Sequence, residues 1–164
     1  LTSNSSTSFI SKLFSNSSKS SYVVVHIKSI SLSSRLSFLL NISITSAYRS
    51  YDEQRKLYNT YLKLYGKSYV DKYVAVPGYS EHQTGLAIDL ESLECDIFRN
   101  SKEYLWVREN AYNYGFIIRY QKGKEKITGY STEEWHIRYV GKKAAEYIYK
   151  NNITFEEYYN LYLK

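Results

Sequence analysis

Two histidines and two carboxylates lie in two short segments of this 164-residue chain, in an arrangement suited to metal chemistry. His82 and Asp89 flank the glycine at Gly85, and Glu133 lies shortly before His136. Two imidazoles and one carboxylate supply three ligands for zinc, leave one position open for water, and leave one carboxylate free as a base. The residue types and their spacing therefore predict a catalytic zinc site.

The segments that carry two of these ligands alternate between apolar and polar residues, as strands do when one face is buried. Asp89 lies on the polar side of residues 86–90, and His136 lies on the polar side of residues 135–139. If the two strands are neighbours in one sheet, both side chains face the same cleft. His82 is then expected to approach this cleft from the loop that precedes the glycine turn.

The predicted base does not follow the strand alternation. Glu133 has the wrong parity to share a face with His136 on a flat strand, so a turn or bulge must return its carboxylate to the metal side. Trp135 falls on the apolar side of the same strand. We expect its indole in the core, forming the floor of the site.

The remaining pattern indicates an α+β fold with a small antiparallel sheet flanked by helices, because strands and helices do not alternate regularly. Capping residues indicate where the helices begin. At two of these starts, a serine or threonine is followed three residues later by a glutamate, which is the pattern of a capping box. The expected strands cover residues 22–27, 42–45, 86–90, 116–119 and 135–139. The expected helices start at Ser50 with Glu53, at Asn100 with Glu103, near Lys142, and at Thr154 with Glu157.

Length and composition suit one domain with an unusual beginning. Residues 1–40 are rich in serine and are expected to form a partly flexible leader, whereas residues 41–164 are expected to form the catalytic domain. The formal charge of +6 and the absence of a reading motif do not indicate a nucleic-acid partner. No segment approaches the ~20 apolar residues of a membrane span, so stable membrane insertion is not expected.

Three blocks resemble the VanY-type zinc D-alanyl-D-alanine carboxypeptidases, a group that shares its metal site with the Hedgehog signalling domain. The resemblance runs from about Ile42 to the C-terminus. Residues 46–50, together with Gln54, resemble the family's Ser-Gly-Tyr-Arg-Ser segment. Residues 80–89 match Ser-x-His-x-x-Gly-x-Ala-x-Asp, and residues 133–136 match Glu-x-Trp-His. The family implies a Hedgehog/DD-peptidase-like fold.

The resemblance implies a role for each matching position. One zinc ion per chain would be bound by His82, Asp89 and His136, and the general base would be Glu133. The substrate would be contacted by Arg49, Ser80 and Gln54. Arg49 would also act in catalysis by stabilising negative charge on the substrate. Glu134 stands where the family usually has proline, so a second carboxylate lies near the predicted base.

The implied reaction is removal of the C-terminal D-alanine from peptidoglycan stem peptides. We expect a monomer that acts outside the cytoplasmic membrane. Three alternatives stay open. The first alternative is an L,D-carboxypeptidase or wall endopeptidase on the same fold. The second is a non-catalytic zinc-binding module, and the third is an inactive fragment with an atypical start. Retention of Glu133 argues against the non-catalytic module, because such a module does not need the base.

Overall fold

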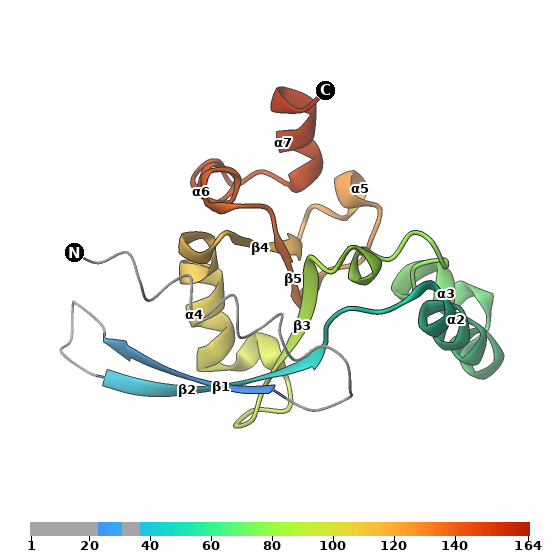
Figure 1. Cartoon of the computed structure of the whole chain (residues 1–164), viewed down its shortest axis with the longest axis horizontal. Helices are drawn as coiled ribbons and strands as arrows, with labels where there is room; N and C mark the ends of the chain where they lie inside the picture. The colour runs from blue at the N-terminus through green and yellow to red at the C-terminus, as the bar shows by residue number, and fades with distance from the viewer. Residues whose placement is uncertain (1–22, 31–36) are drawn as a thin grey trace.

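Five antiparallel strands form one sheet, in the spatial order β1-β2-β3-β5-β4 (Figure 1). The computed structural model describes residues 23–30 and 37–164, with side chains from residue 40 onward. The strands are β1 (Val23–Ile30), β2 (Ser37–Ser46), β3 (Ala87–Ser92), β4 (Phe116–Tyr120) and β5 (Glu133–Tyr139). The predicted α+β class with a small antiparallel sheet is confirmed.

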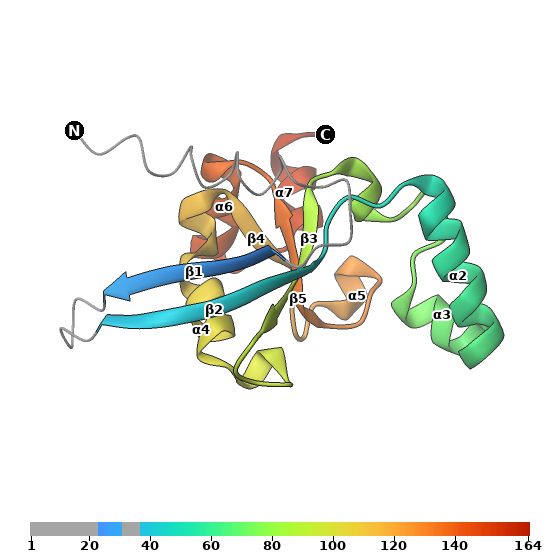
Figure 2. The same ribbon diagram turned by 60° about the horizontal axis from the view of Figure 1, so that its bottom comes forward.

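Helices flank the sheet on several sides. In Figures 1 and 2, α4 lies beside β1 and β2, α6 and α7 lie near β4, and α2 and α3 form a pair at the opposite end of the molecule. The α-helices are α2 (Tyr51–Tyr65), α3 (Lys67–Tyr73), α4 (Lys102–Asn110), α5 (Glu125–Thr128), α6 (Lys142–Asn151) and α7 (Phe155–Tyr162). Short 3-10 helices cover Glu81–Thr84, Phe98–Asn100 and Ala111–Tyr114. Within the described residues, no helix has both the length and the apolarity needed to cross a bilayer.

Strand β1 lies inside the range that we expected to be the leader. It pairs with β2 in a continuous antiparallel register, with Ile27 opposite Leu40. The β-branched run from Val23 to Ile27 explains this strand, because such residues favour the pleated backbone. Residues 37–40 of that range belong to β2, and residues 1–22 and 31–36 lie outside the described residues. The boundary at residue 40 stays a prediction.

Two of the predicted helix starts are complete capping boxes. At α2, the backbone N–H of Ser50 donates to the Glu53 carboxylate (2.8 Å), and the Ser50 hydroxyl accepts from the Glu53 N–H (3.3 Å). At α7, Thr154 and Glu157 make the same exchange at 2.7 and 3.2 Å. Each box satisfies helix N–H groups that have no partner within the helix, so local sequence alone predicts both starts.

The start of α4 was predicted one residue too early. Ser101, not Asn100, is the N-cap, and its hydroxyl accepts from the Tyr104 N–H at 3.0 Å. Glu103 does not cap the helix, because its fully buried carboxylate accepts from the Asn41 N–H (3.1 Å) and from a serine hydroxyl of β3 (2.9 Å). A carboxylate that resembles a local cap therefore connects α4 to two strands.

The main core lies between α4 and one face of the sheet. Alternate residues of the three central strands point into it, and Ile88 of β3 lies opposite Ile137 of β5. Val107 of α4 packs against this face. The core members on the sheet are Leu40, Ile42, Ile44, Ile88, Leu90, Phe116 and Ile137. The opposite face of β3 and β5 is left for the polar residues between them.

Candidate metal centre

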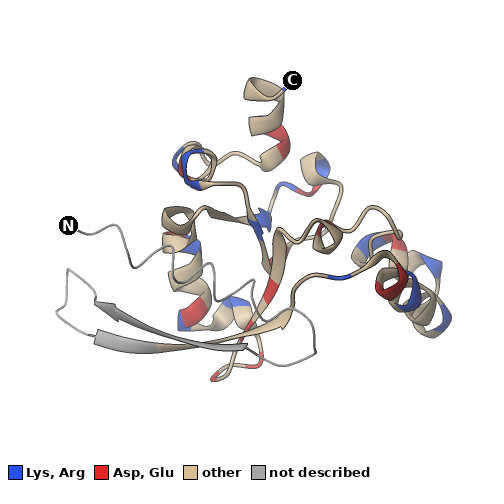
Figure 3. Ribbon diagram, in the orientation of Figure 1, with Lys and Arg blue, Asp and Glu red and all other residues tan. Residues whose placement is uncertain are grey.

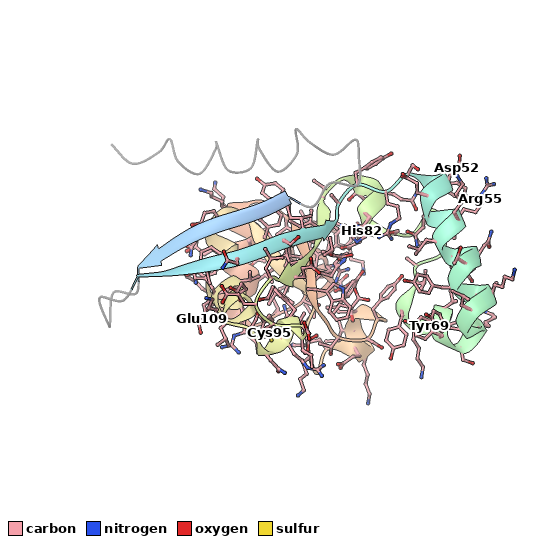
Figure 4. All side chains as sticks on the ribbon, turned by 90° about the horizontal axis from the view of Figure 1, so that it is seen from below. Asp52, Arg55, Tyr69, His82, Cys95 and Glu109 are labelled. Atoms are coloured by element: carbon pink, nitrogen blue, oxygen red, sulfur yellow. The ribbon has the colours of Figure 1, made fainter. Side chains whose placement is uncertain are left out.

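Three side chains that are far apart in the sequence meet beside β3 and β5. Asp89 lies directly opposite His136 in the antiparallel register, so both side chains project from the same face, as expected. His82 lies on the 3-10 turn Glu81–Thr84, which Gly85 ends in the left-handed conformation (φ 71°). Figure 4 places His82 beyond the end of β2, on the side toward α2. One ligand atom from each residue lies within 4.8 Å of the other two.

The imidazole rings are oriented by their outer nitrogens. His82 Nδ1 donates to the Ala47 carbonyl oxygen at 2.7 Å, and His136 Nε2 lies 3.4 Å from the Glu81 carboxylate. The inner nitrogens, His82 Nε2 and His136 Nδ1, lie 3.2 and 2.9 Å from the two oxygens of Asp89. Because the outer nitrogens have acceptors, the inner nitrogens are the ones available to a metal ion.

The chemistry of these donors fits zinc. Two imidazole nitrogens and one carboxylate oxygen form a frequent protein ligand set for catalytic zinc, which keeps a further position for water or substrate. Both histidines are buried, at 4% exposure each, so their orientation is fixed by packing as well as by hydrogen bonds. A site of this kind needs little rearrangement to hold a divalent ion.

The electrostatic environment of the cluster favours a cation. Burial lowers the pKa of His136, but hydrogen bonds to Asp89 and Glu81 outweigh this effect and raise the pKa to about 9. Burial raises the pKa of Asp89, yet its hydrogen bonds to both histidines bring the pKa below its usual range. The two shifts share one cause, which is the pairing of the Asp89 carboxylate with the imidazoles.

A bulge in β5 brings Glu133 to the metal side. In the β4–β5 ladder, Ile118 pairs with Ile137 but Tyr120 pairs with Glu133, so β5 uses four steps where β4 uses two. The two extra residues interrupt the regular pairing of β5, and a Glu133 oxygen lies 4.0 Å from Nδ1 of His136. The bulge predicted from the parity of Glu133 is therefore present.

The pKa of Glu133 is raised to about 7. Burial is the largest cause, and the charges of Asp89 and Glu81 add to it, whereas the charge of His136 acts in the opposite direction. A carboxyl group with a pKa near neutrality can both accept and release a proton at physiological pH. This protonation behaviour is what a general base beside a metal needs.

The two residues that follow Glu133 in the bulge do not join the metal cluster. Glu134 lines a separate cavity of about 390 Å³, together with Tyr104 and Tyr149, and this cavity does not include Glu133 or the metal cluster. Trp135 is 39% exposed, so our expectation of a core indole beneath the site was wrong. The expectation assumed regular alternation along β5, which the two extra residues interrupt.

Arg49 is held at the edge of the site by neutral groups. Its guanidinium donates to the Gln54 side-chain oxygen and to the Ser46 hydroxyl, both at 2.7 Å, and its backbone N–H donates to the His82 carbonyl oxygen (3.2 Å). Among the described residues, no carboxylate lies within ion-pair distance of Arg49, although its charge contributes to lowering the pKa of Glu53. Neutral groups therefore orient the guanidinium.

Gln54 and Ser80 are less open to solvent than a substrate contact suggests. Gln54 is 1% exposed, and its amide nitrogen donates to the Ala75 carbonyl oxygen (2.7 Å) while its oxygen accepts from Arg49. Ser80 is 7% exposed, and its carbonyl oxygen accepts from the Gln83 N–H. The substrate roles of these two residues stay predictions, and the geometry places Gln54 behind Arg49.

Sequence reasoning missed Glu81, although this residue lies inside the ligand motif. Its carboxylate contacts His136, Arg119 of β4 and Arg138 of β5. Burial raises the pKa of Glu81, but the hydrogen bond from His136 and the two arginine charges outweigh burial and hold the pKa at about 2. Arginines inside otherwise apolar strands are the available sequence signal, because a buried guanidinium requires a carboxylate partner.

Known proteins share this fold and much of this sequence. YodJ from Bacillus subtilis (strain 168) is 48% identical over 123 residues, which are 72% of this chain and 45% of YodJ. The LdcB LD-carboxypeptidase structure is 47% identical, with a TM-score of 0.68, and the match covers 74% of this chain and 59% of LdcB. The chain thus spans about half the length of YodJ and somewhat more of LdcB.

A further solved structure contains a metal. It is a mutant of the vancomycin resistance D,D-pentapeptidase VanY, from a VanB-type resistance cassette, in complex with Zn(II). It is 32% identical to this chain, with a TM-score of 0.66, and the match covers 85% of this chain and 92% of that protein. The family model "VanY: D-alanyl-D-alanine carboxypeptidase" matches residues 33–142. This chain belongs to the VanY D-alanyl-D-alanine carboxypeptidase family.

Proposed function

We propose that this protein is a zinc-dependent D,D-carboxypeptidase that removes the C-terminal D-alanine from peptidoglycan stem peptides. One observation carries the proposal: two histidines and an aspartate converge, and a separate glutamate with a pKa near 7 lies beside them. A zinc-binding module without catalytic activity needs the two histidines and the aspartate but not the glutamate. Family membership supports the substrate class.

One zinc ion per chain would be held by His82, Asp89 and His136. When bound, zinc supplies Lewis acidity toward the scissile carbonyl and lowers the pKa of a water molecule to about 7. The side chains contribute orientation, since both imidazoles already direct their inner nitrogens toward Asp89. The negative potential around His136 adds affinity for a divalent cation.

Glu133 would move the proton in the reaction. Its carboxylate takes a proton from the attacking water and delivers it to the departing amine of the terminal residue. The carboxyl oxygen lies 4.0 Å from His136 Nδ1, which is close enough for it to accept a proton from a water molecule bound beside the metal ligands. Burial supports this role, because it makes the protonated form accessible at neutral pH.

Arg49 would bind the terminal carboxylate of the substrate. Its planar guanidinium suits a carboxylate through two charge-assisted hydrogen bonds. Gln54 and Ser46 hold the guanidinium in place, and no described carboxylate lies within ion-pair distance of it. We therefore assign Gln54 mainly to the positioning of Arg49, and Ser80 to the buried wall that precedes His82.

The test is product analysis by mass spectrometry. Zinc-loaded protein is incubated with stem peptides ending in D-Ala-D-Ala, and release of a single D-alanine is expected. Glu133→Gln should lower kcat by about 100-fold or more, because it removes the proton acceptor without changing the shape of the side chain. If wild-type protein releases no D-alanine, or if Glu133→Gln releases it at the wild-type rate, the proposal is wrong.

The neighbouring carboxylate provides a matched control. Glu134→Gln makes the same chemical change one residue away, on a side chain that lines the separate cavity. Its kcat should stay within about twofold of the wild-type value, because it contacts no reacting group in this proposal and its charge raises the pKa of Glu133 less than burial, Asp89 or Glu81 does. A large loss in Glu134→Gln with little loss in Glu133→Gln would exchange the roles of the two residues.

An L,D-carboxypeptidase is the second candidate function, favoured by the 47% identity to LdcB. A tetrapeptide ending in L-Lys-D-Ala separates the two, since only the L,D-enzyme releases its D-alanine. A peptide ending in D-Ala-D-lactate reports tolerance at the last position. In either case we propose that the protein works as a monomer on stem peptides outside the cytoplasmic membrane.

A further inference from the structure

A partly buried carboxylate lies on the side of His136 opposite the predicted metal position. Glu81 comes immediately before the ligand His82, and its side chain is 13% exposed. One of its oxygens, Oε2, lies 3.4 Å from His136 Nε2, whereas His136 Nδ1 faces Asp89. The imidazole is therefore placed between two carboxylates, of which only Asp89 belongs to the predicted ligand set.

The other oxygen of Glu81 is occupied by two arginines. Oε1 accepts from Nε of Arg119 at 2.8 Å and from Nη1 of Arg138 at 2.9 Å. Arg119 and Arg138 come from the neighbouring strands β4 and β5, where Ile117 pairs with Arg138. This arrangement fixes the carboxylate plane and directs Oε2 at the imidazole.

The terminal helix completes this cluster. Glu156, in the first turn of α7, accepts from Arg119 Nη1 at 3.1 Å through one oxygen, and its second oxygen accepts from Nη2. The preceding Phe155 ring lies beside both guanidinium groups, at 5.5 Å from Arg119 and 5.2 Å from Arg138. Figure 3 shows the basic position on β4 and the acidic positions at the start of α7.

The four charges of this cluster cancel, since two glutamates face two arginines. The cluster therefore adds little net charge to the metal site, and its effect on His136 is local and directional. A hydrogen bond from Nε2 to a fixed carboxylate keeps the proton on that nitrogen and leaves the Nδ1 lone pair for a metal. The Ala47 carbonyl oxygen does the same for His82.

We propose that Glu81 is a positioning residue for the ligand His136, and that α7 supports it through Glu156 and Arg119. Residues 155 and 156 lie outside the family match at residues 33–142, so this support extends the metal site to a helix beyond the matched region. The inference rests on the proposed metal binding. It adds a role for a carboxylate that neither binds the metal nor touches substrate.

The first test measures zinc affinity by competition with a chromophoric chelator, which does not depend on catalysis. Glu81→Gln keeps the size of the side chain and removes its charge, and we expect the zinc dissociation constant to rise by about 10- to 100-fold. Glu109→Gln, an exposed change on α4, is the matched control and should leave the constant within about twofold. Thermal unfolding of the zinc-free variants shows whether each is folded.

A second readout separates positioning from simple structural support. The visible spectrum of the cobalt(II) form reports ligand geometry, and Glu81→Gln should shift its bands while Glu109→Gln should not. Glu81→Asp restores the charge on a shorter side chain and should recover part of the affinity. Glu156→Gln acts through one more residue, and we expect a smaller rise in the dissociation constant, of about two- to fivefold.

The outcomes distinguish this inference from the proposed function. Failure of wild-type protein to bind zinc would defeat both. Wild-type zinc affinity and an unchanged cobalt spectrum in folded Glu81→Gln would overturn the positioning role and leave the carboxypeptidase proposal intact. If Glu81→Gln does not fold, the decision rests on Glu156→Gln, whose side chain is more exposed: an unchanged dissociation constant there overturns the inference, and the expected rise supports it.

Discussion

The two faces of β3 and β5 belong to the same strands but are held by different interactions. On one face, Ile88 and Ile137 lie opposite each other in the core under α4, and burial of apolar surface stabilises them. On the other face, Asp89 and His136 lie opposite each other, and hydrogen bonds and charges set their geometry. Burial of polar groups costs free energy unless partners are supplied. The apolar face therefore supplies stability, whereas the polar face uses it to hold reactive groups in place.

The largest expected effect comes from the polar face. Asp89→Asn keeps the shape of the side chain but weakens a ligand that lies between both histidines. We expect zinc affinity to fall by more than about 100-fold, since loss of a mere outer partner already costs 10- to 100-fold. Chelator competition measures this loss. Affinity within tenfold of wild type would show that Asp89 is no ligand.

The apolar face should respond in stability and not in metal affinity. Ile137→Ala removes a side chain that is 6% exposed and leaves a cavity, so we expect the free energy of unfolding to fall by about 3 kcal/mol. Urea unfolding of the zinc-free protein measures this change. Zinc affinity of the folded variant should change far less than in Asp89→Asn, and an equal loss would mean that the two faces are not separable.

Trp135 sharpens the comparison because it lies on the same strand as Ile137 but in the bulge. Trp135→Ala should lower the free energy of unfolding by less than about 1.5 kcal/mol, whereas a core tryptophan costs 3–5 kcal/mol. Its 39% exposure is the reason. A core-sized loss in urea unfolding would contradict the bulged register of β5.

The smallest effect concerns a carboxylate remote from the metal. The hydrogen bond to the Thr154 N–H is the largest cause that lowers the pKa of Glu157 below 4.5 in the folded protein. A lowered folded pKa adds stability above the unfolded pKa, and this contribution disappears as pH falls through the folded value. Glu157→Gln should therefore lose less stability than wild type between pH 7 and pH 3. An equal pH dependence in urea unfolding would remove Glu157 from the acid response.

Features that depend on local chemistry were predicted correctly from the sequence, whereas features that depend on distant partners were not. The capping boxes at Ser50 and Thr154 are decided within three residues, so they could be identified from local chemistry. The predicted start of α4 was one residue too early because Glu103 does not cap the helix. Its carboxylate has partners on two distant strands, which a local pattern does not contain. The strand expected at residues 22–27 is present as β1, because its β-branched run is a local signal, but its pairing with β2 involves a partner that the local pattern does not contain.

By itself, the sequence determined the three predicted ligands that meet at the candidate site. Motif spacing and strand parity placed His82, Asp89 and His136 together and required a bulge at Glu133, because ligand type and the two-residue period of a strand are properties of the local chain. The tertiary structure alone decided the rest: Glu134 lines a separate cavity, Trp135 is partly exposed, and the Glu81 carboxylate contacts His136. These outcomes depend on the register of β5 against β4 and on charges brought from β4 and α7, so no local pattern contains them.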